Sequence, residues 1–162
     1  MTLQICAWLA VVFYALHVME EHTFNWRDWA RGALGLPAEW NDFYVTNAAV
    51  IVLGVVAAEL AQALPVITLA YAALMLINAV LFHFMPMIRA KGRFSPGAIT
   101  AALLFLPLGM EEVLAASREG VLSGATVGGA FVIGAVLMAF PIVMLKAKSH
   151  PYFRQDLTIP AA

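Results

Sequence analysis

The chain has 162 residues and a net charge of −1, and 63% of its residues are hydrophobic whereas only 12% are charged. Soluble domains are about half apolar and about a quarter charged, so this composition excludes an ordinary soluble domain, and the near-neutral charge gives no sign of nucleic-acid binding. The length fits one domain, and the single cysteine, Cys6, excludes an internal disulfide.

Five apolar blocks follow one another along the chain, at about 3–19, 44–61, 64–88, 97–116 and 121–145. Each comes close to the roughly 20 residues that cross a bilayer. Because the blocks are continuous rather than alternating, and since an open sheet cannot satisfy its backbone in lipid, they predict helices. The predicted fold class is all-α: a bundle of about five transmembrane helices over residues 1–148, followed by a cytoplasmic tail over 149–162.

The first block ends in a run of ionisable side chains, with His17, Glu20 and Glu21 spaced i, i+3 and i+4 on one helix face. His22 points partly away from that face. Carboxylates at a helix C-terminus face the negative end of the helix dipole, so a metal ion or a positive partner should compensate them. Imidazole and carboxylate suit zinc, iron or manganese, and the same groups could transfer protons.

The segment 22–43 alternates tryptophan and other apolar side chains with charged ones. This pattern predicts a partly helical interfacial segment with its aromatic side chains at the level of the lipid headgroups. The alternative is a lid that covers a site just below it.

The second and third blocks are separated only by the turn 62–65, so they predict an antiparallel helical hairpin. At a rise of about 1.5 Å per residue, His83 falls near the depth of Glu20 and Glu21. Asn78 and Asn47 fall near the depth of His17. We therefore expect these side chains to converge in the inner leaflet: His17, Glu20, Glu21, Asn47, Asn78 and His83.

The basic residues predict the orientation, because cytoplasmic loops carry an excess of Lys and Arg. With five spans, Arg118 falls on one side of the membrane and the other eight basic residues fall on the opposite side. The eight are Arg27, Arg31, Arg89, Lys91, Arg93, Lys146, Lys148 and Arg154. We expect a cell-membrane protein with its N-terminus outside and its C-terminus in the cytoplasm.

Further acidic residues lie nearer the outer face. An ionisable residue within a span is a functional hypothesis by default, so Glu111 is interpreted as a group that extends the cavity outward or that is protonated. Glu112 and Glu59 are placed close to the outer interface, in contact with water. The last block is rich in glycine, which predicts close packing against a neighbouring helix or against a second copy of the chain.

Two motifs together resemble the signatures of a known family. The run His17-x-x-Glu20-Glu21 is similar to the motif that names the HXXEE family of small polytopic membrane proteins. The family's second signature is Asn, four residues, His, ten residues, an aromatic residue, one residue and Pro-Gly. It is matched here by Asn78, His83, Phe94, Pro96 and Gly97.

Phe94 stands where the family usually has tyrosine. Pro96-Gly97 also has a local interpretation, as the turn that precedes the fourth span. The family has no settled biochemical function, so the resemblance implies site residues and not a reaction.

Three hypotheses about function remain open at this point. The first is a metal-dependent membrane enzyme, a hydrolase or oxidoreductase whose hydrophobic or lipid-like substrate enters from the inner leaflet. Zinc or iron would be held by His17, Glu20, Glu21 and His83, and one of the carboxylates would serve as a general base. The substrate or the ligands would be oriented by Asn47, Asn78, His22 and Glu111.

The second hypothesis is a metal-free acid/base isomerase or cyclase of isoprenoid-like substrates. The third is a non-catalytic metal or proton transporter, or a subunit of a membrane complex.

Overall fold

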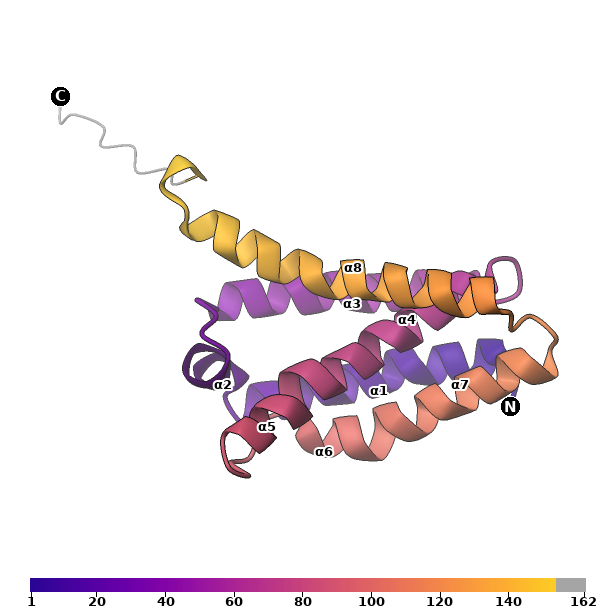
Figure 1. Ribbon diagram of the computed structural model, residues 1–162, viewed down its shortest axis with the longest axis horizontal. Helices are drawn as coiled ribbons and strands as arrows, with labels where there is room; N and C mark the ends of the chain where they lie inside the picture. The colour runs from indigo at the N-terminus through magenta and orange to yellow at the C-terminus, as the bar shows by residue number, and fades with distance from the viewer. Residues whose placement is uncertain (154–162) are drawn as a thin grey trace.

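The computed structural model describes residues 1–153, and Arg154 and the rest of the predicted tail lie outside that range. All of the regular secondary-structure elements in the described part are helices (Figure 1). Five helical segments are long and apolar enough to cross a membrane: Leu3–Thr23, Trp40–Glu59, Pro65–Arg89, Ala98–Arg118 and Gly124–Ser149. The all-α fold and the five spans are therefore confirmed, and the chain is a multi-pass membrane protein.

Helix α1 (Leu3–Thr23) ends beyond its apolar block, and α3 (Trp40–Glu59) begins before its own block. The hydroxyl of Thr2 accepts a hydrogen bond from the amide of Ile5 and caps α1. A capping box between Glu39 and Asp42 starts α3 at Trp40, before the apolar block begins. Because α1 continues to Thr23, the whole His17-x-x-Glu20-Glu21 motif lies inside the helix.

The segment between these two helices is partly helical, as predicted. It contains α2 (Trp26–Ala33), which lies at one end of the bundle (Figure 1). Trp29 and Ala30 are buried, and the ring of Trp26 lies 5.7 Å from that of Phe43. The segment is thus anchored to the bundle by its apolar side chains.

The third and fourth spans are each interrupted by a π-helical turn, which the sequence reasoning did not predict. The third span consists of α4 (Pro65–Asn78), the π-helix η1 (Ala79–Phe84) and α5 (Met85–Arg89). The fourth consists of α6 (Ala98–Thr100), the π-helix η2 (Ala101–Phe105) and α7 (Leu106–Arg118). Such π-helical turns are rare in proteins, and those that do occur are often found at functional sites.

Two prolines explain where the interruptions fall. Pro86 and Pro107 each follow directly on a π-turn, at the second residue of α5 and of α7. A proline has no amide hydrogen, and its ring clashes with the carbonyl four residues earlier in an α-helix. Here those carbonyls belong to Phe82 and Leu103, which lie inside the π-turns, so the wider turn relieves the clash.

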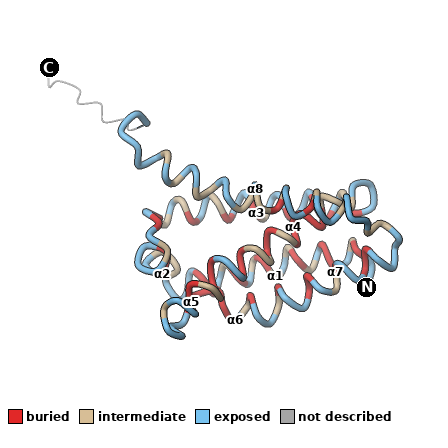
Figure 2. Tube along the Cα trace, viewed as in Figure 1, coloured by how far each residue is buried: buried red, intermediate tan, exposed pale blue. Residues whose placement is uncertain are grey.

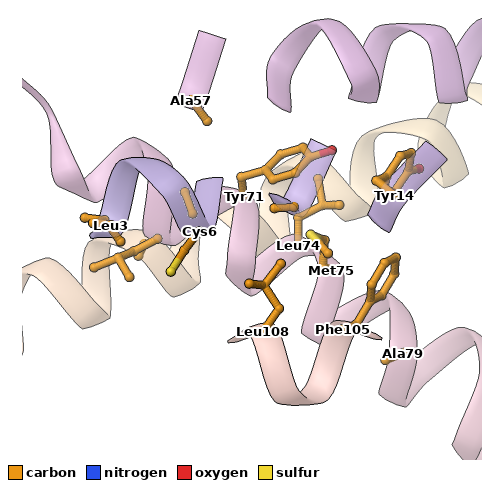
Figure 3. Close-up of a cluster of buried hydrophobic side chains, with 14 of the residues drawn as sticks. Leu3, Cys6, Tyr14, Ala57, Tyr71, Leu74, Met75, Ala79, Phe105 and Leu108 are labelled. Atoms are coloured by element: carbon orange, nitrogen blue, oxygen red, sulfur yellow. The ribbon is translucent and has the colours of Figure 1, made fainter. Parts of the chain in front are cut away.

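The buried core lies among α1, α4 and the fourth span (Figures 2 and 3). Its larger members include Leu3, Tyr14, Leu74, Met75 and Phe105. Helix α8 (Gly124–Ser149) packs along α4 and is mostly exposed apart from Ala130 and Gly134.

The glycines of the last span divide between two surroundings. A Cβ on Gly134 would lie 2.7 Å from the carbonyl oxygen of Ala70, so this glycine lets α8 approach α4 closely. A Cβ on Gly124 or Gly128 would meet nothing within 4 Å. Close packing within the chain accounts for Gly134, and a homodimer through the remaining face stays a prediction.

The elements that carry most of the basic residues lie at the same end of the bundle. These are α2, the end of α5 and the end of α8 (Figure 1). The geometry therefore agrees with the charge asymmetry of the sequence. Which end faces the cytoplasm stays a prediction.

Candidate functional site

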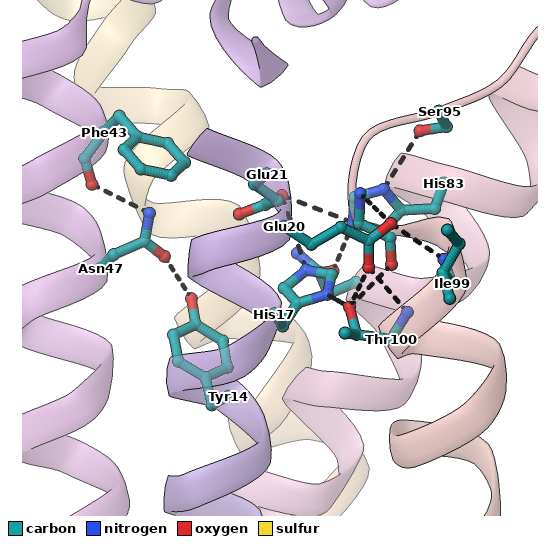
Figure 4. A network of polar contacts seen from close by, with 12 residues as sticks. Tyr14, His17, Glu20, Glu21, Phe43, Asn47, His83, Ser95, Ile99 and Thr100 are labelled. Atoms are coloured by element: carbon teal, nitrogen blue, oxygen red, sulfur yellow. Dashed lines mark hydrogen bonds and ion pairs between the residues drawn. The ribbon is translucent and has the colours of Figure 1, made fainter. Parts of the chain in front are cut away.

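Two histidines from different spans meet inside the bundle. His17 on α1 and His83 on η1 are both 0% exposed, and their ring centroids lie 4.9 Å apart at an interplanar angle of 84°. The Oε1 atom of Glu21 lies 3.5 Å from the Nε2 atom of each ring. Figure 4 shows this grouping, which we call the His/Glu cluster: His17, Glu21 and His83.

Each motif spacing has a local structural reason. His17 and Glu21 are separated by four residues and share one face of α1. Asn78 and His83 are separated by five, which in an α-helix would place them about 140° apart. The π-turn η1 brings residues five apart onto one face, and His83 Nε2 donates to Asn78 Oδ1 at 2.9 Å. The Asn-x4-His spacing is therefore met by a π-helix.

The hydrogen bonds around His17 fix the orientation of its ring. The Thr100 hydroxyl has one hydrogen, and it donates that hydrogen to Glu20 Oε2 at 2.6 Å. Thr100 Oγ1 must then accept from His17 Nδ1, which lies 2.8 Å away. His17 Nε2 consequently carries a lone pair, and this buried atom has no hydrogen-bond partner among the described residues.

Glu20 does not join the cluster, because as the neighbour of Glu21 in α1 it points about 100° away around the helix. Its Oε1 atom accepts from the amides of Gly97 and Ile99 at 3.1 Å each. Its Oε2 atom accepts from the Thr100 amide at 2.7 Å and from the Thr100 hydroxyl. The carboxylate therefore caps the N-terminus of the fourth span, where the helix dipole favours a negative charge. The structure does not place Glu20 where it could share a metal ion with both histidines.

Gly97 forms one wall of the cluster. Its φ of 95° lies in the left-handed region. A Cβ at this position would lie 2.6 Å from Cε1 of His83 and 2.7 Å from Cε1 of His17. Both imidazoles thus pack against the bare Cα of Gly97, so the Pro-Gly motif does more than start a turn.

Three contributing residues were missed by the sequence reasoning as site residues: Ser95, Gly97 and Thr100. Ser95 is 0% exposed, and its hydroxyl lies 3.1 Å from His83 Nδ1. Because His83 Nε2 carries the donated hydrogen, Nδ1 accepts from Ser95. The sequence did contain a signal for these residues. Ser95 and Gly97 lie within the second motif, and Thr100 lies about one helical turn after it.

Asn47 has the predicted depth but lies beside the cluster, not in it. The Tyr14 hydroxyl donates to Asn47 Oδ1 at 2.6 Å, and Asn47 Nδ2 donates to the carbonyl of Phe43 at 3.0 Å (Figure 4). The residue nevertheless borders the same space as the cluster. A cavity of about 60 Å³ is lined by Tyr14, Glu21, Asn47 and Asn78.

Apolar side chains complete the wall of this cavity. Trp26, Leu36 and Ala38 come from the segment 22–43, and Met138 and Pro141 come from α8. The segment 22–43 therefore covers part of the cavity, and its role as a lid stays a prediction. We call this space the polar cavity.

The remaining predicted site residues lie elsewhere. His22 is exposed beside the aromatic side chains of α3, with its Nε2 atom 3.1 Å from the Tyr44 hydroxyl. Glu111 accepts from Arg118 at 2.5 Å and pairs with the Met1 amino group at 3.3 Å. It therefore lies near the start of α1, roughly 20 Å from His17 at about 1.5 Å per residue. Neither residue can contact an ion or a substrate at the cluster.

The expectations for the two outer acids of the fourth span were wrong. Glu112 was placed in contact with water, but it is 1% exposed, and its Oε1 atom has no partner within residues 1–153. Glu111, expected to extend the site, is the more exposed of the pair. Glu59 is exposed, as predicted.

One family model matches the chain, over residues 8–110, and its description is HXXEE: Protein of unknown function with HXXEE motif. Comparisons with curated proteins and with solved structures found no match. The matched range holds His17, Glu21 and His83 together with both motifs and all of the polar residues that surround them. Since it also spans more than half of the chain, the protein belongs to the HXXEE family.

Proposed function

We propose that the protein is a membrane-embedded, metal-dependent enzyme that acts on a hydrophobic or lipid-like substrate. A single divalent ion, zinc or iron, would be held by the His/Glu cluster. The observation that carries this proposal is the free lone pair of His17 Nε2, which faces Glu21 in a fully buried position. An unpartnered buried nitrogen is costly unless something occupies it.

The spacing of the ligand atoms supports the same conclusion. A tetrahedral ion about 2.1 Å from each of its ligands keeps them about 3.4 Å apart. The Oε1 atom of Glu21 lies 3.5 Å from each imidazole Nε2 atom. Two histidines and one glutamate are a known zinc ligand set in hydrolytic enzymes. The ion would therefore require little movement of Glu21.

Three protein ligands leave a coordination position free, which distinguishes catalytic from structural sites. Glu21 and Asn78 border the polar cavity, so that position would face a space open to substrate. A divalent ion there would activate water or polarise a substrate oxygen. The proposal thus places the chemistry at the boundary between the cluster and the cavity.

The surrounding polar residues would hold the ligands in place. Thr100 already fixes the tautomer of His17 through Nδ1. Binding of His83 through Nε2 would require the other tautomer, with the ring proton on Nδ1, and would free the Asn78 oxygen for a substrate group. The Ser95 hydroxyl can then accept from His83 Nδ1, since a hydroxyl both donates and accepts.

We also propose how the chain is oriented in the membrane. The excess of Lys and Arg at the end that carries α2 favours a cytoplasmic position for this end, with the N-terminus outside. The cluster lies near the C-terminal end of α1. The substrate would therefore reach it from the inner leaflet.

A second candidate function is a metal-free acid/base enzyme, such as an isomerase or cyclase. It is favoured by the hydrogen bond that His83 Nε2 donates to Asn78 Oδ1, which keeps a proton on a proposed ligand atom. In that case Glu21 would relay a proton between the two imidazoles and a substrate in the polar cavity.

Quantitative metal analysis separates the two candidates. The protein, purified in detergent, is loaded with zinc or iron(II), dialysed and analysed for bound metal. We expect one ion per chain in the wild type and in His22→Ala, the matched control in which a nearby histidine outside the cluster is removed. His17→Ala and His83→Ala should lose the ion. A wild type that retains no metal, or a His17→Ala/His83→Ala double variant that retains it, would remove the metal proposal.

A further inference from the structure

A groove of about 570 Å³ runs between α3 and α8 on the surface of the bundle. Its walls come from those two helices alone, with Ala49 and Leu53 on one side and Phe140 and Met144 on the other. From Asn41 to Leu53 the groove extends about 18 Å along α3, more than half of a hydrocarbon core of about 30 Å. A single apolar chain aligned with the helices would fit this length.

The groove and the polar cavity share part of their walls. Asp42, Thr46, Pro141 and Leu145 line both spaces. Pro141 lies inside α8, where a proline removes a backbone hydrogen bond and bends the helix. Beyond this region α8 diverges from the bundle (Figure 1). At the seam between α3 and α8, these shared residues separate the groove on the surface from the polar cavity. The polar cavity is in turn bordered by Glu21 of the His/Glu cluster.

The polar cavity selects the kind of group that can reach the cluster. At about 60 Å³ it has room for only a few heavy atoms, which excludes a phospholipid headgroup. Among the residues that the structure describes, its lining holds two acids, Glu21 and Asp42, and neither Lys nor Arg. The nearest basic side chain of the groove, Lys148, already donates to both carboxylate oxygens of Asp42, at 2.9 and 3.0 Å.

A hydroxyl or carbonyl group suits this lining. The Asn78 amide nitrogen makes no hydrogen bond within residues 1–153, so it can donate to a substrate oxygen. The Glu21 carboxylate can accept from a substrate hydroxyl. In the metal-free protein an anionic end group would instead face the Glu21 carboxylate in a low-dielectric space, and among the described residues no Lys or Arg lines the cavity to pair with it.

We propose that the seam between α3 and α8 is the access route to the site, and that the substrate is an uncharged molecule with one long apolar chain and a terminal hydroxyl or carbonyl group. This inference rests on the proposed function, because it assumes that the cluster is the reacting centre. The chain would lie in the groove beside Ala49 and Phe140, and the polar end would pass Thr46 into the cavity.

Photolabelling tests the route. A long-chain alcohol that carries a diazirine is incubated with the purified protein in the presence of a chelator and irradiated, and the labelled peptides are identified by mass spectrometry. We expect labels on α3 and on the C-terminal half of α8. Unlabelled long-chain alcohol should compete, whereas the corresponding fatty acid and lysophosphatidic acid should compete poorly. Equal competition by either anionic lipid would overturn the inferred substrate class.

Two tryptophan variants locate the label. Ala49→Trp fills the groove, and because Ala49 is exposed the fold should tolerate it; labelling should fall about tenfold, since the indole occupies the space of the chain. Val113→Trp is the matched control. It adds the same side chain to a second apolar groove of about 440 Å³, between α4, α7 and α8, and should leave labelling unchanged. Loss of labelling in Val113→Trp but not in Ala49→Trp would place the chain in the second groove and overturn the route.

The same measurement keeps the two proposals apart. Labelling in the groove does not require the ion, so it should persist in the His17→Ala/His83→Ala variant. Groove labelling in a wild-type protein that retains no metal after loading would defeat the metal proposal alone. A wild-type protein that retains the ion after loading but shows no groove labelling would defeat the access route alone.

Discussion

Replacing Glu20 by glutamine should destabilise the fold far more than the same change at Glu21. The Glu20 carboxylate accepts from three backbone amides and one hydroxyl at the start of the fourth span. A glutamine keeps one acceptor oxygen and turns an amino group toward the other donors, so about two of these bonds are lost. Hydrogen bonds to charged groups contribute about 1.5–3 kcal/mol each, and the favourable interaction with the helix dipole adds about 0.3–1 kcal/mol.

The free energy of unfolding should therefore fall by about 3 kcal/mol or more in Glu20→Gln. Glu21 accepts no hydrogen bond within the described residues, and its Oε1 atom only lies 3.5 Å from the Nε2 atom of each imidazole. Glu21→Gln should change the stability of the metal-free protein by about 1 kcal/mol or less, and it should abolish metal binding. Both variants are compared by thermal unfolding in detergent with a chelator present, and then by metal analysis. Equal destabilisation by the two changes would refute the division of roles between these neighbouring carboxylates.

Three further predictions follow from individual residues. Gly97→Ala should lower metal binding at least about tenfold, because a Cβ there displaces both imidazoles. Gly92 also has a positive φ but has open surroundings, so Gly92→Ala should retain the ion in the same dialysis assay. Glu112→Met should raise the free energy of unfolding by about 1–3 kcal/mol, since it removes a buried carboxyl with an unpartnered oxygen, and a lower melting temperature would contradict this. With the native cysteine fully buried, an impermeant maleimide applied to intact cells should label Gln62→Cys and spare Ser149→Cys; the opposite pattern would reverse the orientation.

The sequence predicted the meeting of His17, Glu21 and His83 because depth in a bilayer can be counted along each span. It could not distinguish Glu20 from Glu21. Both lie within about one turn of His17 on α1, and their roles depend on where the fourth span begins. Asn47 shows the same limit, because its depth was predicted correctly while its direction around the bundle depends on how α3 packs.

The errors at Glu111 and Glu112 have a more specific cause. A π-turn holds an extra residue, and at 3.6 residues per turn one residue rotates the rest of a helix by about 100°. The turn η2 precedes both acids, so the face that each presents could not be counted from the start of the span. Pro107 was visible in the sequence, but a proline can kink, end or widen a helix, and the packing decides among these.

X-ray absorption spectroscopy of the zinc-loaded protein tests the proposed centre most directly. The account predicts a shell of nitrogen and oxygen atoms at about 2.0–2.2 Å, with scattering from two imidazole rings that disappears in the His17→Ala/His83→Ala variant and persists in His22→Ala. A shell that contains sulfur, or one without imidazole scattering in the wild type, would contradict it.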